Sequence, residues 1–118
     1  MMERLYRVIN ATTGQVLFQR ARIAQDFKSR SVGLLNRSSL DEDEALLIKP
    51  CNAIHTFFMK FPIDIAFLDK NGKVVKARAN LGKNRLCSAM LHGYMVLEMS
   101  AGSLAKIELN QGNVLKIE

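Results

Sequence analysis

Residues 54–75 read IHTFFMKFPIDIAFLDKNGKVV, and they predict successive strands joined by turns. Apolar and aromatic side chains dominate residues 54–59 and again residues 63–68, which is typical of buried strands. Pro62 separates the two runs, because proline cannot donate a hydrogen bond to a strand ladder. The turn sequence DKNG at residues 69–72 follows, and Asn-Gly between apolar runs is a strong hairpin signal. We therefore expect a β-hairpin centred on this turn.

The returning strand of this hairpin, residues 75–81, alternates between two kinds of side chain. One parity carries Val75, Ala77, Ala79 and Leu81, and the other carries Lys76, Arg78 and Asn80. Such alternation predicts one packed face and one basic face that meets water. Residues 81–93 then lack a clear period and end at a glycine, so we expect a long loop there.

The flanking sequence predicts several shorter elements. We expect strands at residues 4–10 and 15–21 around a turn at residues 10–14, a helix at residues 26–34 that starts near Asp26, a solvated loop at residues 38–44, a buried strand at residues 45–48, a strand at residues 94–99, a helix at residues 104–109 and a last strand at residues 114–117. These elements predict a mainly β (α+β) fold. Its centre would be a single compact mixed or antiparallel sheet, a closed or nearly closed barrel, with two short helices.

Size and composition limit the class of protein. A chain of 118 residues suits a single domain over residues 1–118. Apolar residues make up 48% and charged residues 24%, which is typical of a globular protein and not of a disordered chain. No apolar run has the length of a membrane span or a signal peptide, so we expect a cytoplasmic protein.

Residues 55–69 resemble the signature of domain-of-unknown-function family 192, a group of small bacterial and archaeal proteins. Further pieces match in order: Arg30 with Gly33-Leu34, then Ala45 to Ile48, then Val96-Leu97-Glu98 with Ala101-Gly102, then Gln111-Gly112-Asn113. The family commonly has a Pro-Trp-Arg piece where this chain has residues 81–85, and only Arg85 matches it. Asn113 also stands where an aspartate is usual. The resemblance implies a compact β fold and no particular reaction.

Three polar residues stand out within the predicted strands. Asp64 has apolar neighbours, and a buried carboxylate needs a partner or backbone hydrogen bonds. Asp64 either accepts backbone amides at the Pro62 kink or faces a ligand, with Arg30 or Glu98 nearby. His55 either bonds a backbone carbonyl in the core or lines a site. Glu98 either lines a cavity or faces water.

Metal and cofactor chemistry finds little support in the sequence. Cys51-x3-His55 and Cys87-x4-His92 would supply two sulfurs and two imidazoles, but these spacings differ from those of common zinc modules. Glycine-rich phosphate loops, the dinucleotide fingerprint and the Gly-x-Ser-x-Gly elbow are all absent from the sequence. We therefore predict no metal and no cofactor, and two reduced cysteines.

The net charge of +6 favours anionic partners at long range. The residues Lys76, Arg78 and Arg85 would form a basic surface. Such a surface is typical of a protein that binds nucleic acid or an anionic surface, and it is also typical of a face that keeps a protein in solution. Nucleic acid is not the favoured partner.

The favoured function is a small binding or accessory domain. It would hold an unknown small polar or anionic ligand in a cleft near Arg30, His55, Asp64 and Glu98. The alternative enzyme class is a hydrolase or lyase that uses Asp64 or Glu98 with His55 as acid and base.

Overall fold

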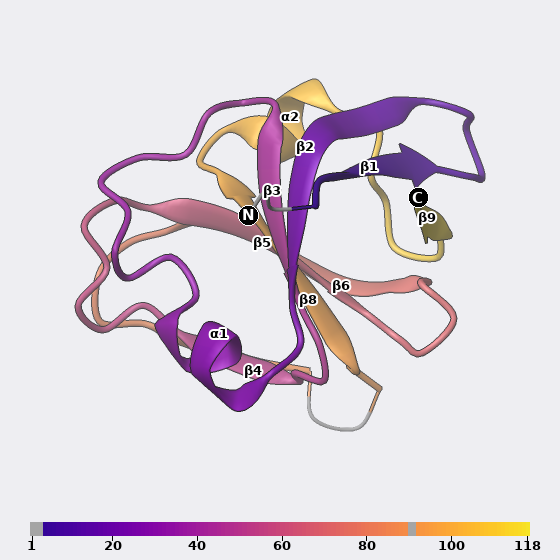
Figure 1. The fold of residues 1–118 in the computed structure, drawn as a ribbon. Helices are drawn as coiled ribbons and strands as arrows, with labels where there is room; N and C mark the ends of the chain where they lie inside the picture. Colours follow the sequence, from indigo (N-terminus) through magenta and orange to yellow (C-terminus); the bar gives the residue numbers. More distant parts are fainter. Residues whose placement is uncertain (1–3, 90–91) are drawn as a thin grey trace.

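The computed structural model describes residues 4–89 and 92–118, and this part of the chain forms nine strands and two short helices (Figure 1). In chain order they are β1 (Tyr6–Asn10), β2 (Val16–Ala24), α1 (Phe27–Val32), β3 (Glu44–Ile48), β4 (Ala53–His55), β5 (Ile63–Leu68), β6 (Val74–Leu81), β7 (Leu86–Ser88), β8 (Met95–Ser100), α2 (Ser103–Lys106) and β9 (Leu115–Ile117). The mainly β class with two short helices is thus confirmed.

Seven of these strands form one mixed sheet in the order β6-β5-β8-β3-β2-β1-β9. Its neighbours are antiparallel except β2 and β3, which run parallel. Parallel neighbours cannot be joined by a tight turn, so residues 25–43 cross over between them and include α1. The strands β4 and β7 pair separately as a small antiparallel sheet. Figure 1 places α1 and β4 together at one end of the molecule, away from β1 and β9.

The edge strands β6 and β9 of the large sheet meet only at one end. A single bridge joins Lys73 to Val114, and the Leu115 amide donates to the Gly72 carbonyl at 2.8 Å. Beyond this contact, the described parts of β6 and β9 form no ladder with each other. The predicted mixed sheet is therefore confirmed, but it is not the single sheet that was expected, because β4 and β7 form a second one. A barrel closed along its whole length is not found in the described residues.

Apolar side chains pack on both faces of the large sheet. On β5, Ala66 and Leu68 belong to one cluster, whereas Ile65 and Phe67 belong to the other. Every residue of β3, β5 and of β8 up to Met99 is buried, which explains why these segments read as nearly continuous apolar runs. Ile54 of β4 and Cys87 of β7 join the second cluster, so the small sheet covers that face.

The predicted hairpin at residues 69–72 is confirmed. Asp69 Oδ1 accepts the amides of Asn71 and Lys73 at 2.8 and 3.0 Å, and Gly72 has a φ of 84°. A positive φ favours glycine, and a Cβ there would come within 2.5 Å of the Leu115 carbonyl oxygen. Gly72 is therefore required both by the turn and by the contact between the sheet edges.

Two predicted segments differ from the structure around Thr56. The strand expected over residues 54–59 ends at His55, and the loop expected over residues 81–93 contains β7. The buried Thr56 hydroxyl bonds the Gly82 carbonyl and accepts the Arg85 amide. Such side-chain to backbone bonds compete with a strand ladder, so the chain turns at Thr56.

Candidate functional site

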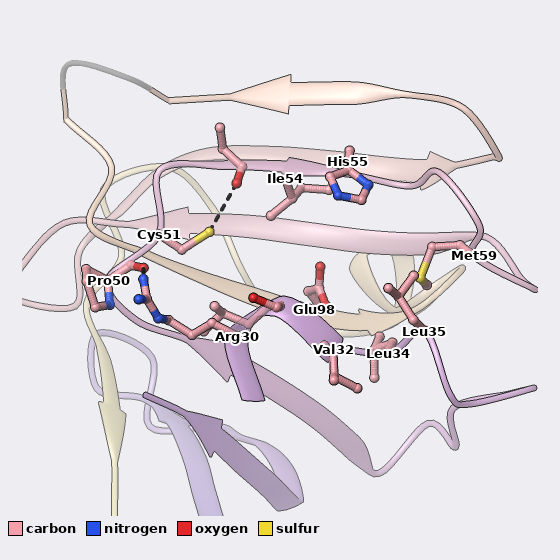
Figure 2. A pocket seen from close by; sticks show the side chains of 14 residues that line it. Arg30, Val32, Leu34, Leu35, Pro50, Cys51, Ile54, His55, Met59 and Glu98 are labelled. Carbon is pink, nitrogen blue, oxygen red and sulfur yellow. Dashed lines mark hydrogen bonds between the residues drawn. The ribbon is translucent and has the colours of Figure 1, made fainter. Parts of the chain in front are cut away.

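A pocket of about 150 Å³ lies between α1, β4 and the large sheet (Figure 2). Its lining combines the C-terminal half of α1, the chain that leads into β4, and one carboxylate from the sheet. The lining residues are Arg30, Ser31, Val32, Gly33, Leu34, Leu35, Ile48, Pro50, Cys51, Ala53, Ile54, His55, Met59 and Glu98. The pocket therefore brings together three of the residues predicted from the sequence, namely Arg30, His55 and Glu98.

Glu98 lies on β8 and points to the face covered by the small sheet. It pairs in register with Ile65, and the side chains of directly opposite residues share a face. Only 6% of Glu98 is exposed, and its carboxyl has no hydrogen bond or ion pair with any residue in the described ranges. Burial raises the pKa of this carboxyl to about 7. Near neutral pH the group therefore exists in both protonation states.

Gly33 leaves the Glu98 carboxyl uncovered. A Cβ built on Gly33 would lie 4.0 Å from Glu98 Oε1 and 3.9 Å from the Ile48 side chain. The φ of 48° at this helix end also suits glycine, because side chains rarely adopt it. Gly33 thus ends α1 and keeps the space above the carboxyl open. The resemblance singled out Gly33, although the sequence alone assigned it no place in a site.

Arg30 reaches the pocket from the last turn of α1. Asp26 is the N-cap of this helix, as its position near the predicted start indicated, and its carboxylate accepts the Ser29 amide at 2.7 Å. Arg30 Nη1 donates to the Pro50 carbonyl at 3.0 Å. Its Nε is buried and has no hydrogen-bond partner within residues 4–89 and 92–118. One side of the guanidinium is anchored, and its donor capacity is only partly used.

Cys51, which lies just before β4, and His55, the last residue of β4, both line the pocket (Figure 2). The Cys51 thiol donates to the Ala53 carbonyl at 3.1 Å, and burial raises the pKa of the thiol, with the negative charge of Glu98 acting in the same direction. A thiol held protonated is a poor nucleophile. The exposed His55 stacks on Phe57 with ring centroids 5.4 Å apart. His55 is thus a pocket residue and not a core histidine.

Asp64 lies on the opposite face of the large sheet from Glu98. It pairs in register with Met99, and neighbouring residues along a strand point to opposite faces. Its fully buried carboxylate accepts the amides of Asn80, Gly102 and Leu104 at 2.7, 3.1 and 2.9 Å. One of its two expected roles was to accept amides at the Pro62 kink, but these three amides belong to β6 and to the start of α2. The structure therefore does not bring Asp64 into the pocket.

The three basic residues predicted from the sequence lie outside the pocket. Lys76 Nζ donates to the Ser88 carbonyl at 2.6 Å, and Arg78 Nη1 donates to the Ala77 carbonyl at 3.0 Å. Arg85 is exposed in the segment just before β7. In the described part of the chain, no three His, Cys, Asp or Glu side chains gather as metal ligands would. Neither helix there has the length and apolar character needed to cross a membrane.

Comparison with known proteins identifies the family of this chain. The model of domain-of-unknown-function family 192 (DUF192), described as "Uncharacterized ACR", matches residues 8–117. The chain belongs to the DUF192 family. A search of curated proteins finds no significant match to this DUF192 chain.

Two solved structures share the fold of the DUF192 chain. One comes from Sinorhizobium meliloti 1021 and is described as a candidate transcription regulator; it is 20% identical, with a TM-score of 0.82 over 95% of this chain and 91% of that one. The other, from Novosphingobium aromaticivorans DSM 12444, is described as a protein of unknown function; it is 23% identical, with a TM-score of 0.80 over 95% of this chain and 83% of that one. At these identities the likeness concerns the fold alone.

Proposed function

We propose that this DUF192 chain is a ligand-binding domain whose pocket takes a small polar or anionic molecule. The observation that carries the proposal is the Glu98 carboxyl, which is buried, unpaired within the described residues and part of a pocket wall. A buried carboxyl without a partner destabilises a fold by several kcal/mol. Groups kept under such a penalty cluster at functional sites, where a ligand supplies the missing partner.

The size of the pocket limits the ligand. Pockets for drug-sized molecules have volumes of roughly 300–1,000 Å³, whereas this pocket has about 150 Å³. A cavity near that volume holds a molecule about as large as benzene. The apolar side chains of Ile54 and Met59 would contact the body of such a ligand, and the polar groups would contact its functional group.

The polar groups favour an anion with a carboxylate or similar head. A guanidinium donates two parallel hydrogen bonds to a carboxylate, and Arg30 still has donors to offer. Below its pKa of about 7, the protonated Glu98 carboxyl would donate a hydrogen bond to the ligand. Above this pKa, the ionised carboxylate would repel the anion. Binding of an anion should therefore weaken as the pH rises through 7.

Binding of small acids to the wild-type protein tests this proposal. Benzoate, nicotinate, butyrate and inorganic phosphate are each added, and the melting temperature is measured at pH 6 and pH 8. At least one carboxylate should raise the melting temperature, and more so at pH 6. Arg30→Gln should abolish the rise, while Arg78→Gln, a matched change outside the pocket, should preserve it. The proposal fails if no acid stabilises the protein or if both variants respond alike.

A hydrolase or lyase built on these residues has less support. Asp64 lies on the other face with its oxygens occupied, so it has no part in the pocket and instead holds β6 and α2 in place. Glu98 and His55 remain as an acid and base that line one pocket. A ligand site accounts for both of them without a reaction, and binding is therefore the function we propose.

A further inference from the structure

Two segments next to β4 and β7 form one surface, which we call the tip: residues 56–61, TFFMKF, and residues 82–86, GKNRL, of which Leu86 is the first residue of β7. Thr56 ties them together, because its amide donates to the Arg85 carbonyl at 2.9 Å and its hydroxyl bonds the Gly82 carbonyl and accepts the Arg85 amide. Thr56 is fully buried. The side chains around it therefore share a surface although they are distant in the sequence.

The tip exposes large apolar side chains. Phe58 is 86% exposed and Leu86 is 76% exposed, and the partly exposed Phe57 lies next to Phe58. Single exposed apolar residues are common on soluble proteins, but a group of them marks an interaction surface.

The backbone at Phe58 makes this exposure costly. Residues 56–59 form a turn in which the Met59 amide donates to the Thr56 carbonyl at 3.1 Å, and Phe58 has a φ of 68°. Glycine or asparagine is usual at such a position, because a bulky side chain is strained there. A phenylalanine held in a strained turn and exposed to water contributes nothing visible to packing. Strain of this kind persists where function requires it.

The charges of the tip are all of one sign. Lys60, Lys83 and Arg85 are exposed, and neither loop contains an acidic residue. Exposed basic and apolar side chains on the same two segments match an anionic lipid surface, which attracts the cations and admits the apolar groups below its headgroups. An aliphatic side chain such as Leu86 fits a lipid interface better than a nucleic acid, where aromatic rings stack on bases.

We propose that the tip docks on anionic lipid membranes, with Phe58 and Leu86 entering the headgroup region and Lys60, Lys83 and Arg85 contacting the acidic headgroups. This proposal does not depend on the ligand of the pocket, although Met59 of the tip also lines the pocket. It also differs from the basic surface expected from the sequence, because only Arg85 is common to both.

Vesicle flotation tests docking. Wild-type protein should float with vesicles of phosphatidylcholine and phosphatidylserine, should not float with phosphatidylcholine alone, and should be released by high salt. Phe58→Asn should weaken binding about tenfold or more while the melting temperature is kept or raised, because asparagine tolerates the backbone at residue 58. Lys83→Ser with Arg85→Ser should have a similar effect. Lys70→Ser with Lys73→Ser, at the opposite end of β5 and β6, should bind like wild type.

Three results would overturn the proposal. The first is no flotation with the anionic vesicles at low salt. The second is flotation that survives both tip variants, which would place the contact elsewhere on this cationic protein. The third is tighter binding to a single-stranded oligonucleotide than to vesicles with the same dependence on Phe58, which would make the tip a nucleic-acid surface.

Discussion

Replacing Glu98 with glutamine should make the protein more stable at pH 8, although the residue is central to the pocket. In the folded chain, burial raises the pKa of Glu98 to about 7, whereas the ordinary value in an unfolded chain is 4.5. Between these values the folded state keeps a proton that the unfolded state has released. Stability therefore falls as the pH rises from about 4.5 to 7 and then levels off.

The gap between the two pKa values sets the size of the effect. One pKa unit corresponds to about 1.4 kcal/mol, so the difference amounts to roughly 3 kcal/mol lost by pH 8. Glutamine cannot ionise, so Glu98→Gln should gain up to about 3 kcal/mol over wild type at pH 8 and almost nothing near pH 4.5. This gain is large against the total stability of a small domain, about 5–15 kcal/mol.

Urea denaturation of both proteins across this pH range measures the effect. At each pH, the free energy of unfolding of wild type is subtracted from that of Glu98→Gln. The contributions of the other titrating groups cancel in this difference, which leaves the contribution of residue 98. Glu108→Gln, the same change at an exposed position, corrects for the exchange of carboxylate for amide. A difference that does not vary with pH would refute the reasoning, because it would mean that Glu98 titrates alike in both states.

Three further substitutions test other parts of the fold. Burial raises the pKa of Glu44, but hydrogen bonds from its two arginine partners and a backbone amide outweigh this and lower it to about 2. The stabilisation that ionised Glu44 gives the folded state is present above about pH 4.5 and is lost as the pH falls toward 2. Glu44→Gln should therefore lower the free energy of unfolding by about 1–3 kcal/mol at pH 7 and by little at pH 2. Urea denaturation at a series of acidic pH values measures this difference. Asp64→Ala leaves three amides without their acceptor and should lower the unfolding free energy in urea by about 3 kcal/mol or more; an unchanged midpoint would contradict it. Gly72→Ala places a Cβ within 2.5 Å of a backbone oxygen and should cost about 2 kcal/mol or more in a thermal melt, whereas Gly14→Ala, also at positive φ but with open space around it, should cost less.

The sequence predicted the elements that depend on neighbouring residues. It did not predict how strands from distant parts of the chain align with each other. The hairpin at residues 69–72 and the start of α1 at Asp26 depend on neighbouring residues, so their patterns predicted them. Asp64 and Glu98 point to opposite faces because of how β5 aligns with β8. If β5 were shifted by one residue along β8, both side chains would point to the same face. No local pattern contains that alignment. Of the residues in the expected cleft, Arg30, His55 and Glu98 line one pocket, whereas Asp64 lies on the other face of the sheet.

Two other differences have the same origin. Glu44 ends a run of acidic residues that predicts a solvated loop, yet it is buried because Arg22 and Arg37 reach it from other segments. Thr56 lies in a run of strand-forming residues, yet the loop at residues 82–85 captures its hydroxyl and turns the chain. In both cases a partner far along the chain overrides the local preference.

The two walls of the pocket are held by unequal means. Glu98 lies on β8, which has hydrogen-bonded neighbours β3 and β5 on either side, whereas α1 is six residues long and buries none of them. We expect amide protons of β8 to exchange with solvent mainly through global unfolding, and those of α1 through local opening. For the ligand that we propose, α1 is thus the wall that would open locally to admit it while the sheet stays intact. The rate at which that ligand leaves would then depend on the local stability of α1 more than on the stability of the sheet.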